Sequence, residues 1–237
     1  MLELSDRPLI LGHRGAAAEL AENTLGAFRR AVEQGADGVE LDVQVSADGV
    51  PVVIHDPTLE RTTNGRGAVS SHTWAELSRL HAGPGEPLRS LWDVARWAAD
   101  AGAWLNVELK AEGVAEAALG VLEEADVLER TLVSSFLPAA IREAARSAPQ
   151  VARGVLTETW DAAVLDLADE VGAGAVCLHH PLATEANLAE LARRGLDAVV
   201  WTVDDPARIA GLLRAGVRVV ITNRPDAGVR ARKEAGL

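Results

Sequence analysis

Short apolar runs rich in β-branched residues alternate along this chain with alanine-rich stretches whose apolar residues recur at helical spacing. Asn23 and Thr24 are typical first residues of a helix and Gly35 is a typical residue after one. The predicted helices are residues 23–34, 91–101, 115–125, 138–148, 161–171, 185–194, 206–215 and 226–233. The predicted strands are residues 9–12, 39–42, 104–108, 131–134, 151–156, 175–178, 198–201 and 219–221.

Eight strand–helix units in 237 residues match the number and size of a closed (β/α)8 TIM barrel, an α/β fold. An open doubly wound sheet is the alternative, but residues 12–17 lack the Gly-x-Gly-x-x-Gly turn that would favour it. Polar residues also follow most strands directly, and a barrel brings all these strand ends to one face. We therefore predict one barrel domain over residues 1–237.

The second strand continues into a predicted hairpin. Asp48-Gly49 lies between β-branched runs and favours a two-residue loop, which would pair Asp42 with His55. Glu40 lies two residues before Asp42, so both carboxylates point to one face of the strand. The pattern predicts two carboxylates and an imidazole side by side.

The segment of residues 57–87 is longer than ordinary loops and is predicted to be a lid or cap over the strand ends. Its larger apolar residues are Trp74, Leu77 and Leu80. We expect them to pack the cap onto the barrel, although they also hint at a groove for an acyl chain.

Composition narrows the possible partners. A net charge of −12 without a basic stripe argues against nucleic acid, and it means that a phosphate would need local positive charge or a metal. A single cysteine, Cys177, excludes a disulfide framework and a thiolate metal cluster. Neither a signal peptide nor an apolar run of ~20 residues is visible. We expect a soluble, cytoplasmic protein without a membrane anchor.

Glu40, Asp42 and Glu108 lie at the ends of strands that are neighbours in the predicted barrel. Each one alone could pair with an arginine or cap a helix. Together they would repel one another unless a cation lies between them. An all-oxygen ligand set favours Mg²⁺ or Ca²⁺ over zinc.

His13 and His55 each follow an apolar strand. A lone histidine commonly bonds to a loop carbonyl, but two that converge on carboxylates favour general acid–base chemistry. Arg14 and Lys110 add positive charge that suits a phosphate. Lys110 as a Schiff-base nucleophile is an alternative, but beside Glu108 and a metal it would stay protonated. The set indicates chemistry on a phosphodiester.

Over nearly the whole chain, from His13 to Asn223, the sequence resembles the short cytosolic bacterial branch of the glycerophosphodiester phosphodiesterase family. The segments that carry the resemblance, in order, are His13-Arg14-Gly15, Glu22-Asn23-Thr24, Glu40-Leu41-Asp42-Val43, Asp48-Gly49, His55-Asp56, Leu59-Glu60-Arg61-Thr62-Thr63-Asn64-Gly65, Glu108-Leu109-Lys110, Ser134-Ser135-Phe136 and Trp201-Thr202-Val203. Ala21 and Arg89 depart from it, because the family usually has proline at both places. Both departures concern loop stiffness.

The resemblance implies a barrel with a small cap inserted between its second strand and second helix. It also implies roles for particular residues. The implied acid/base pair is His13 and His55, and the implied metal ligands are Glu40, Asp42 and Glu108. Arg14 and Lys110 would contact the phosphate, and Phe136 and Trp201 would line the glycerol pocket. For Phe136 and Trp201, plain packing in the barrel core is the alternative. His179 also matches a polar position near the rim.

The expected activity is therefore metal-dependent hydrolysis of glycerophosphodiesters, such as glycerophosphocholine or glycerophosphoethanolamine, to sn-glycerol 3-phosphate and an alcohol. A lysophospholipase D-type activity on lysophospholipids is the second hypothesis, and a non-catalytic glycerophosphodiester-binding protein is the third. The sequence leaves open the choice between Mg²⁺ and Ca²⁺, the leaving alcohol, a cyclic phosphate intermediate, the oligomeric state and the physiological role.

Overall fold

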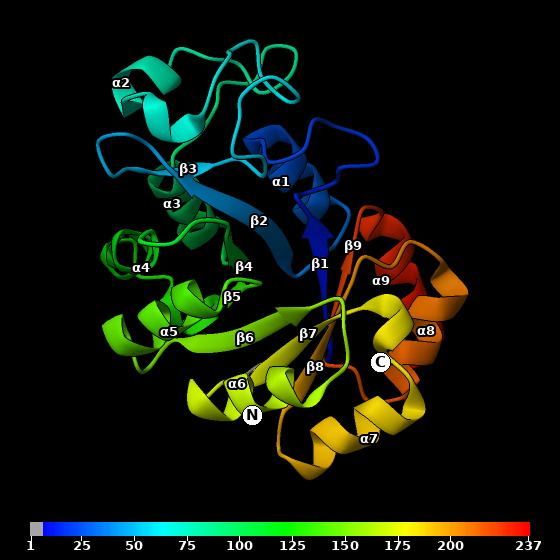
Figure 1. Ribbon diagram of the computed structural model, residues 1–237. Coiled ribbons are helices and arrows are strands. Elements are labelled where there is room, and N and C mark those ends of the chain that lie inside the picture. Colours follow the sequence, from blue (N-terminus) through cyan, green and yellow to red (C-terminus); the bar gives the residue numbers. More distant parts are fainter. Residues whose placement is uncertain (1–6) are drawn as a thin grey trace.

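Eight parallel strands form a closed barrel in the computed structural model, which describes residues 7–237 (Figure 1). The first strand pairs with both the second and the last, and this closes the sheet. The barrel strands are β1 (Leu9–His13), β2 (Gly38–Val45), β4 (Trp104–Leu109), β5 (Thr131–Ser135), β6 (Ala152–Thr157), β7 (Ala175–His179), β8 (Asp197–Trp201) and β9 (Val219–Thr222). The predicted TIM barrel is confirmed. Residues 1–6, within the N-terminal segment in which no signal peptide was expected, lie outside the described residues.

Helices cover the outside of the barrel (Figure 1). They are α1 (Leu25–Glu33), α3 (Leu91–Ala101), α4 (Ala115–Glu124), α5 (Pro138–Ser147), α6 (Ala162–Glu170), α7 (Glu185–Arg193), α8 (Pro206–Arg214) and α9 (Pro225–Glu234), with single 3-10 turns η2 (Leu128–Arg130) and η3 (His180–Leu182). Several begin at a side-chain cap; Thr24 Oγ1, for example, accepts a hydrogen bond from the Ala27 amide. Within residues 7–237, no helix combines the length and the apolar character that a membrane crossing requires.

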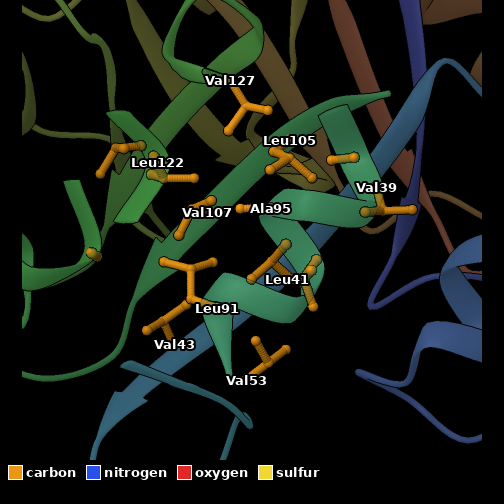
Figure 2. Packing of buried hydrophobic residues seen from close by; sticks show 14 of the residues in the cluster. Val39, Leu41, Val43, Val53, Leu91, Ala95, Leu105, Val107, Leu122 and Val127 are labelled. Carbon is orange, nitrogen blue, oxygen red and sulfur yellow. The ribbon is translucent and has the colours of Figure 1, made fainter. Parts of the chain in front are cut away.

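Alternate residues of each strand face the barrel interior and the surrounding helices. Leu9 and Leu11 belong to the apolar cluster inside the barrel, whereas Ile10 packs outward among the helices. Figure 2 shows the outward face of β2 and β4, where Leu41 and Val107 pack beneath α3. Since every second side chain of a strand points to the same face, His13 points into the barrel like Leu9 and Leu11. It does so at the C-terminal end of β1.

The hairpin after β2 differs from the prediction. The strand β3 (Pro51–Val53) pairs with β2 in a register that joins Val45 to Pro51 and Val43 to Val53. Five residues, 46–50, lie between the two strands, and Gly49 at φ 81° is the only one of them with a left-handed backbone. The predicted pairing of Asp42 with His55 is wrong, since the Ile54 amide donates to the Asp42 carbonyl instead.

A small cap is inserted between β3 and α3, in agreement with the prediction (Figure 1). It contains η1 (Val69–Ser71) and α2 (Trp74–Leu77). It has its own apolar cluster, in which Leu77 is fully buried near Val52 of β3, and Trp74 and Leu80 pack against that cluster. The Trp74 amide also donates to Asp48 in the hairpin, at 2.8 Å. These contacts hold the cap on the second strand of the barrel.

Shortening Leu77 to alanine should destabilise the protein, because no side chain is free to fill the space that it leaves in this small cluster. We expect the free energy of unfolding to fall by about 2–5 kcal/mol in Leu77→Ala, as measured by urea unfolding. Leu20→Ala, at a side chain that is 44% exposed, is the control and should change it by less than about 0.5 kcal/mol. An equally small effect in both variants would contradict the role given to Leu77.

Candidate active site

Three carboxylates meet where β2 and β4 end. One oxygen from each of Glu40, Asp42 and Glu108 lies within 4.8 Å of the others, and all three residues are buried. The sheet register produces this arrangement, because Asp42 pairs directly with Glu108 across the parallel ladder. The structure thus brings together the three residues that the sequence predicts as metal ligands.

Two cations lie against these three carboxylates. Lys110 Nζ lies 2.6 Å from a Glu108 oxygen and 3.6 Å from Asp42 Oδ1. Arg14 Nε lies 3.0 Å from Asp42 Oδ2. Arg14 also has a left-handed backbone, with φ 52°, and its amide N–H donates to Glu40 Oε2 at 2.9 Å. This uncommon conformation for a residue with a side chain directs both the amide and the guanidinium toward the carboxylates.

Three carboxylates face two cations in the cluster, so negative charge is in excess when all three acids are ionised. Burial, and then the nearby Asp42 charge, raise the pKa of Glu40 and of Glu108 to about 8. In addition, Asp42 Oδ1 is buried and accepts no hydrogen bond. A buried carboxylate oxygen without a donor, in an all-oxygen set of mutually repelling acids, fits a hard divalent cation such as Mg²⁺ or Ca²⁺.

The partners of His13 define which ring nitrogen is free. Asn223 Nδ2 donates to Asp204 Oδ2 at 2.8 Å, so Asn223 presents its carbonyl oxygen to His13 Nδ1, at 2.7 Å. His13 Nδ1 must therefore carry the proton, and Nε2 is left as an acceptor 3.9 Å from Glu40. Burial, and then the charge of Arg14, lower the pKa of His13. Both effects favour the neutral form of this ring.

His55 has a different partner, since its Nδ1 lies 2.7 Å from the carboxylate of Asp56. Arg61 donates two hydrogen bonds to that carboxylate and, together with His55, holds the pKa of Asp56 well below its usual range. The Nδ1 atom of His55 therefore bonds to a charged carboxylate, whereas that of His13 bonds to a neutral amide oxygen.

A chain of ion pairs joins the two histidine-bearing segments through the cap. Arg14 Nη1 lies 2.9 Å from Glu22, and Glu22 accepts two further hydrogen bonds from Arg61, at 2.8 and 2.9 Å. Arg61 belongs to the cap and also binds Asp56. The cap therefore helps to position the segment of His55 relative to the β1–α1 loop.

One cavity of about 250 Å³ opens among these groups. Phe136, Trp201 and His179 lie at or near its rim: the Phe136 and Trp201 rings meet edge to face at 5.5 Å, and the His179 ring lies 5.2 Å from Trp201. Trp201 is fixed by its indole N–H, which donates to the Cys177 carbonyl. The residues that line the cavity are His13, Arg14, Glu40, His55, Asn106, Glu108, Lys110, Phe136, Leu156, Glu158, Trp201 and Ile221.

Several residues in or near this cavity have no role in the prediction made from the sequence. Asn106 lies two residues before Glu108 on the same face of β4, and Glu158 lies two residues after Leu156, so strand periodicity could have placed both toward the barrel axis. Asp56 and Arg61 lie within the segments that resemble the family, yet no pattern in the sequence links them to Glu22. That link requires the position of the cap.

Comparison with known proteins identifies the family. The family model described as "Glycerophosphoryl diester phosphodiesterase family" matches residues 13–227. A glycerophosphodiester phosphodiesterase of Caldanaerobacter subterraneus subsp. tengcongensis is 33% identical over 251 aligned positions, which cover 97% of this chain and 100% of the relative. The chain belongs to this family. It is accordingly an enzyme with glycerophosphodiester phosphodiesterase activity, a phosphoric diester hydrolase.

Solved structures agree on the fold. A putative glycerophosphoryl diester phosphodiesterase from Silicibacter pomeroyi superimposes with a TM-score of 0.89 at 25% identity, covering 98% of this chain and 95% of that one. A phosphodiesterase from Oleispira antarctica, solved in complex with the product sn-glycerol-3-phosphate, has a TM-score of 0.87 at 27% identity and covers 96% and 97% of the two chains.

The raised pKa values of Glu40 and Glu108 predict a pH-dependent stability for the metal-free protein. Their folded pKa of about 8 exceeds the ordinary 4.5, so the stability that they contribute is present below pH 4.5 and is lost as the pH rises through 8. We expect the Tm of EDTA-treated protein to fall between pH 5.5 and 8.5. Mg²⁺ or Ca²⁺ at about 100 Kd should restore roughly 5–10 °C at pH 8.5, and less at pH 5.5, where protons compete.

The control is the double variant Glu40→Gln/Glu108→Gln, which removes two charges with little change of shape. Its Tm should vary less over this pH range and should not respond to either metal. A metal-induced rise in Tm of equal size in this variant would contradict the assignment of the cluster as the metal site.

Proposed function

We propose that this enzyme hydrolyses small glycerophosphodiesters, such as glycerophosphocholine and glycerophosphoethanolamine, to sn-glycerol 3-phosphate and an alcohol in a metal-dependent reaction. The observation that carries the proposal is that two histidines, each bonded through Nδ1 to an acceptor oxygen, line the same cavity as Glu40 and Glu108 of the buried acidic cluster. The sn-glycerol-3-phosphate bound in the Oleispira antarctica relative supports the product. The cytoplasmic location expected from the sequence stays a prediction.

His13 acts as the general base in this proposal. Its free Nε2 removes a proton from the nucleophile, which is the glycerol 2-hydroxyl or water, and its Nδ1–H stays bonded to Asn223. His55 acts as the general acid and gives its proton to the oxygen of the leaving alcohol, and its Nδ1 stays bonded to Asp56.

Glu40, Asp42 and Glu108 would hold one divalent ion, Mg²⁺ or Ca²⁺. Such an ion supplies Lewis-acid polarisation of a phosphoryl oxygen and lowers the pKa of a bound hydroxyl or water. Arg14 and Lys110 line the cavity beside these acids and would contact the non-bridging phosphate oxygens. Their donors offset the charge that develops on the phosphoryl group in the transition state.

Phe136 and Trp201 would hold the carbon side of the glycerol moiety in the cavity. The cavity volume of about 250 Å³ is below the roughly 300–1,000 Å³ of pockets for drug-sized ligands. This favours glycerol over an acylated glycerol and ranks the lysophospholipid activity second. The non-catalytic binding protein ranks third, because every group that the acid–base chemistry needs is present.

The first test measures release of sn-glycerol 3-phosphate from glycerophosphocholine and glycerophosphoethanolamine by EDTA-treated protein. We expect no turnover without metal and recovery after addition of Mg²⁺ or Ca²⁺, because the three acids need a cation. Restored release with either ion supports both the metal site and the substrates. Undiminished release in excess EDTA would argue against metal dependence, and the lack of release with any divalent ion would argue against these substrates.

Replacing the histidines tests the acid–base roles. His13→Ala and His55→Ala should each lower kcat by about 10²–10⁴-fold, since each removes one proton-transfer group. His81→Ala, in the exposed part of the cap, is the matched control and should keep kcat within twofold. Circular dichroism should show the same fold in all three variants. Near-normal kcat in either active-site variant would exclude that histidine from catalysis.

A further inference from the structure

The carboxylate of Glu158 has no role in the chemistry described above, although it lines the same cavity as the two histidines. It follows the C-terminal end of β6 and continues the inward series of that strand after Leu156, which lies inside the barrel. The loop that carries it is held by Thr157 and Thr159, since the Thr159 amide donates to Thr157 Oγ1 and that hydroxyl donates to the Thr159 carbonyl. The backbone that carries Glu158 is therefore held at the cavity, although the residue itself is exposed.

The other charged or titratable groups that line the cavity have partners. His13 is bonded to Asn223 and His55 to Asp56. The Arg14 guanidinium contacts Asp42 and Glu22, and Lys110 contacts Glu108. Glu158, in contrast, makes no hydrogen bond or ion pair with any residue in the described range 7–237. The apolar side chains of Phe136, Leu156 and Trp201 line the same cavity. Their one hydrogen-bond donor is the indole N–H of Trp201, which already donates to the Cys177 carbonyl.

We propose that Glu158 is a specificity-determining residue that accepts hydrogen bonds from the free hydroxyl groups of the glycerol moiety. It would thereby select deacylated substrates over lysophospholipids. The inference rests on the proposed function, in which the glycerol moiety lies against Phe136 and Trp201. The apolar side chains would contact its carbon atoms, and the carboxylate would contact its hydroxyls.

The chemistry of the two substrate classes explains the selectivity. An ionised carboxylate has acceptors only, so it pairs with a hydroxyl donor but not with an ester. Acylation of the glycerol converts a donor into an ester, and the carboxylate then faces an acceptor. A hydrogen bond to a charged group is among the stronger ones, and its loss corresponds to about a tenfold change in kcat/KM at this exposed position.

The test compares kcat/KM for glycerophosphocholine and for 1-hexanoyl-glycerophosphocholine, with the metal present. In Glu158→Ala and Glu158→Leu, we expect kcat/KM for glycerophosphocholine to fall about tenfold. The value for the hexanoyl substrate should stay within twofold, or rise in Glu158→Leu because the new side chain is apolar. The preference for the deacylated substrate should therefore fall about tenfold.

Glu112→Ala is the matched control, since it removes the same charge from an exposed position in the loop after β4 that does not line the cavity. It should leave both values unchanged. An equal fall for both substrates in Glu158→Ala would overturn the proposal. So would a rise for both, which would show that Glu158 only repels anionic diesters.

Glycerophosphoinositol, whose leaving alcohol is uncharged, separates a contact to glycerol from a contact to choline. The tenfold fall should also occur with this substrate, and a fall confined to glycerophosphocholine would overturn the proposal by placing Glu158 at the leaving group. Failure of the proposed function has a different signature, because the unaltered enzyme would then hydrolyse none of these substrates with any metal.

Discussion

The repulsion among three buried carboxylates is the constraint around which this end of the barrel is built. Glu40, Asp42 and Glu108 converge because the strand register places them side by side, and burial leaves their charges poorly screened. Arg14 and Lys110 offset part of that charge, and Arg14 adopts a left-handed backbone while doing so. The pKa of Glu40 remains raised all the same. A divalent cation is the group that such a set of ligands accommodates.

The two histidines beside this cluster have different hydrogen-bond partners. A neutral amide, Asn223, holds His13, whereas the carboxylate of Asp56 holds His55. The two rings therefore differ in the charge of the group to which Nδ1 bonds. The cap contributes to this difference, because its Arg61 binds Asp56 and Glu22 together and so links the two histidine-bearing segments. A cap of this kind helps to organise the candidate active site.

The remaining groups of the cavity come from the barrel strands, because successive side chains of a strand point alternately into the barrel and toward the helices. Inward-facing apolar residues such as Leu11, Leu156 and Ile221 fill the interior, and the next inward positions emerge at the open end as polar groups. This explains how a single cavity receives side chains from so many segments. It also explains why Glu158 lines the same cavity.

The amino-acid pattern was sufficient for the barrel, for the helices and strands within a few residues, and for the convergence of Glu40, Asp42 and Glu108. These features depend on local periodicity and on the rule that parallel strand ends share one face. The hairpin register was predicted wrongly because the loop is wider: the Ser46 hydroxyl donates to Asp48 and accepts from the Val50 amide, and the Asp-Gly signal does not report these bonds. Folding in three dimensions sets the partners of the histidines and the exposure of Glu158. Asn223 and His13 are far apart in the chain, and Arg61 reaches Glu22 only when the cap is in place, so contacts of this kind depend on packing rather than on local sequence.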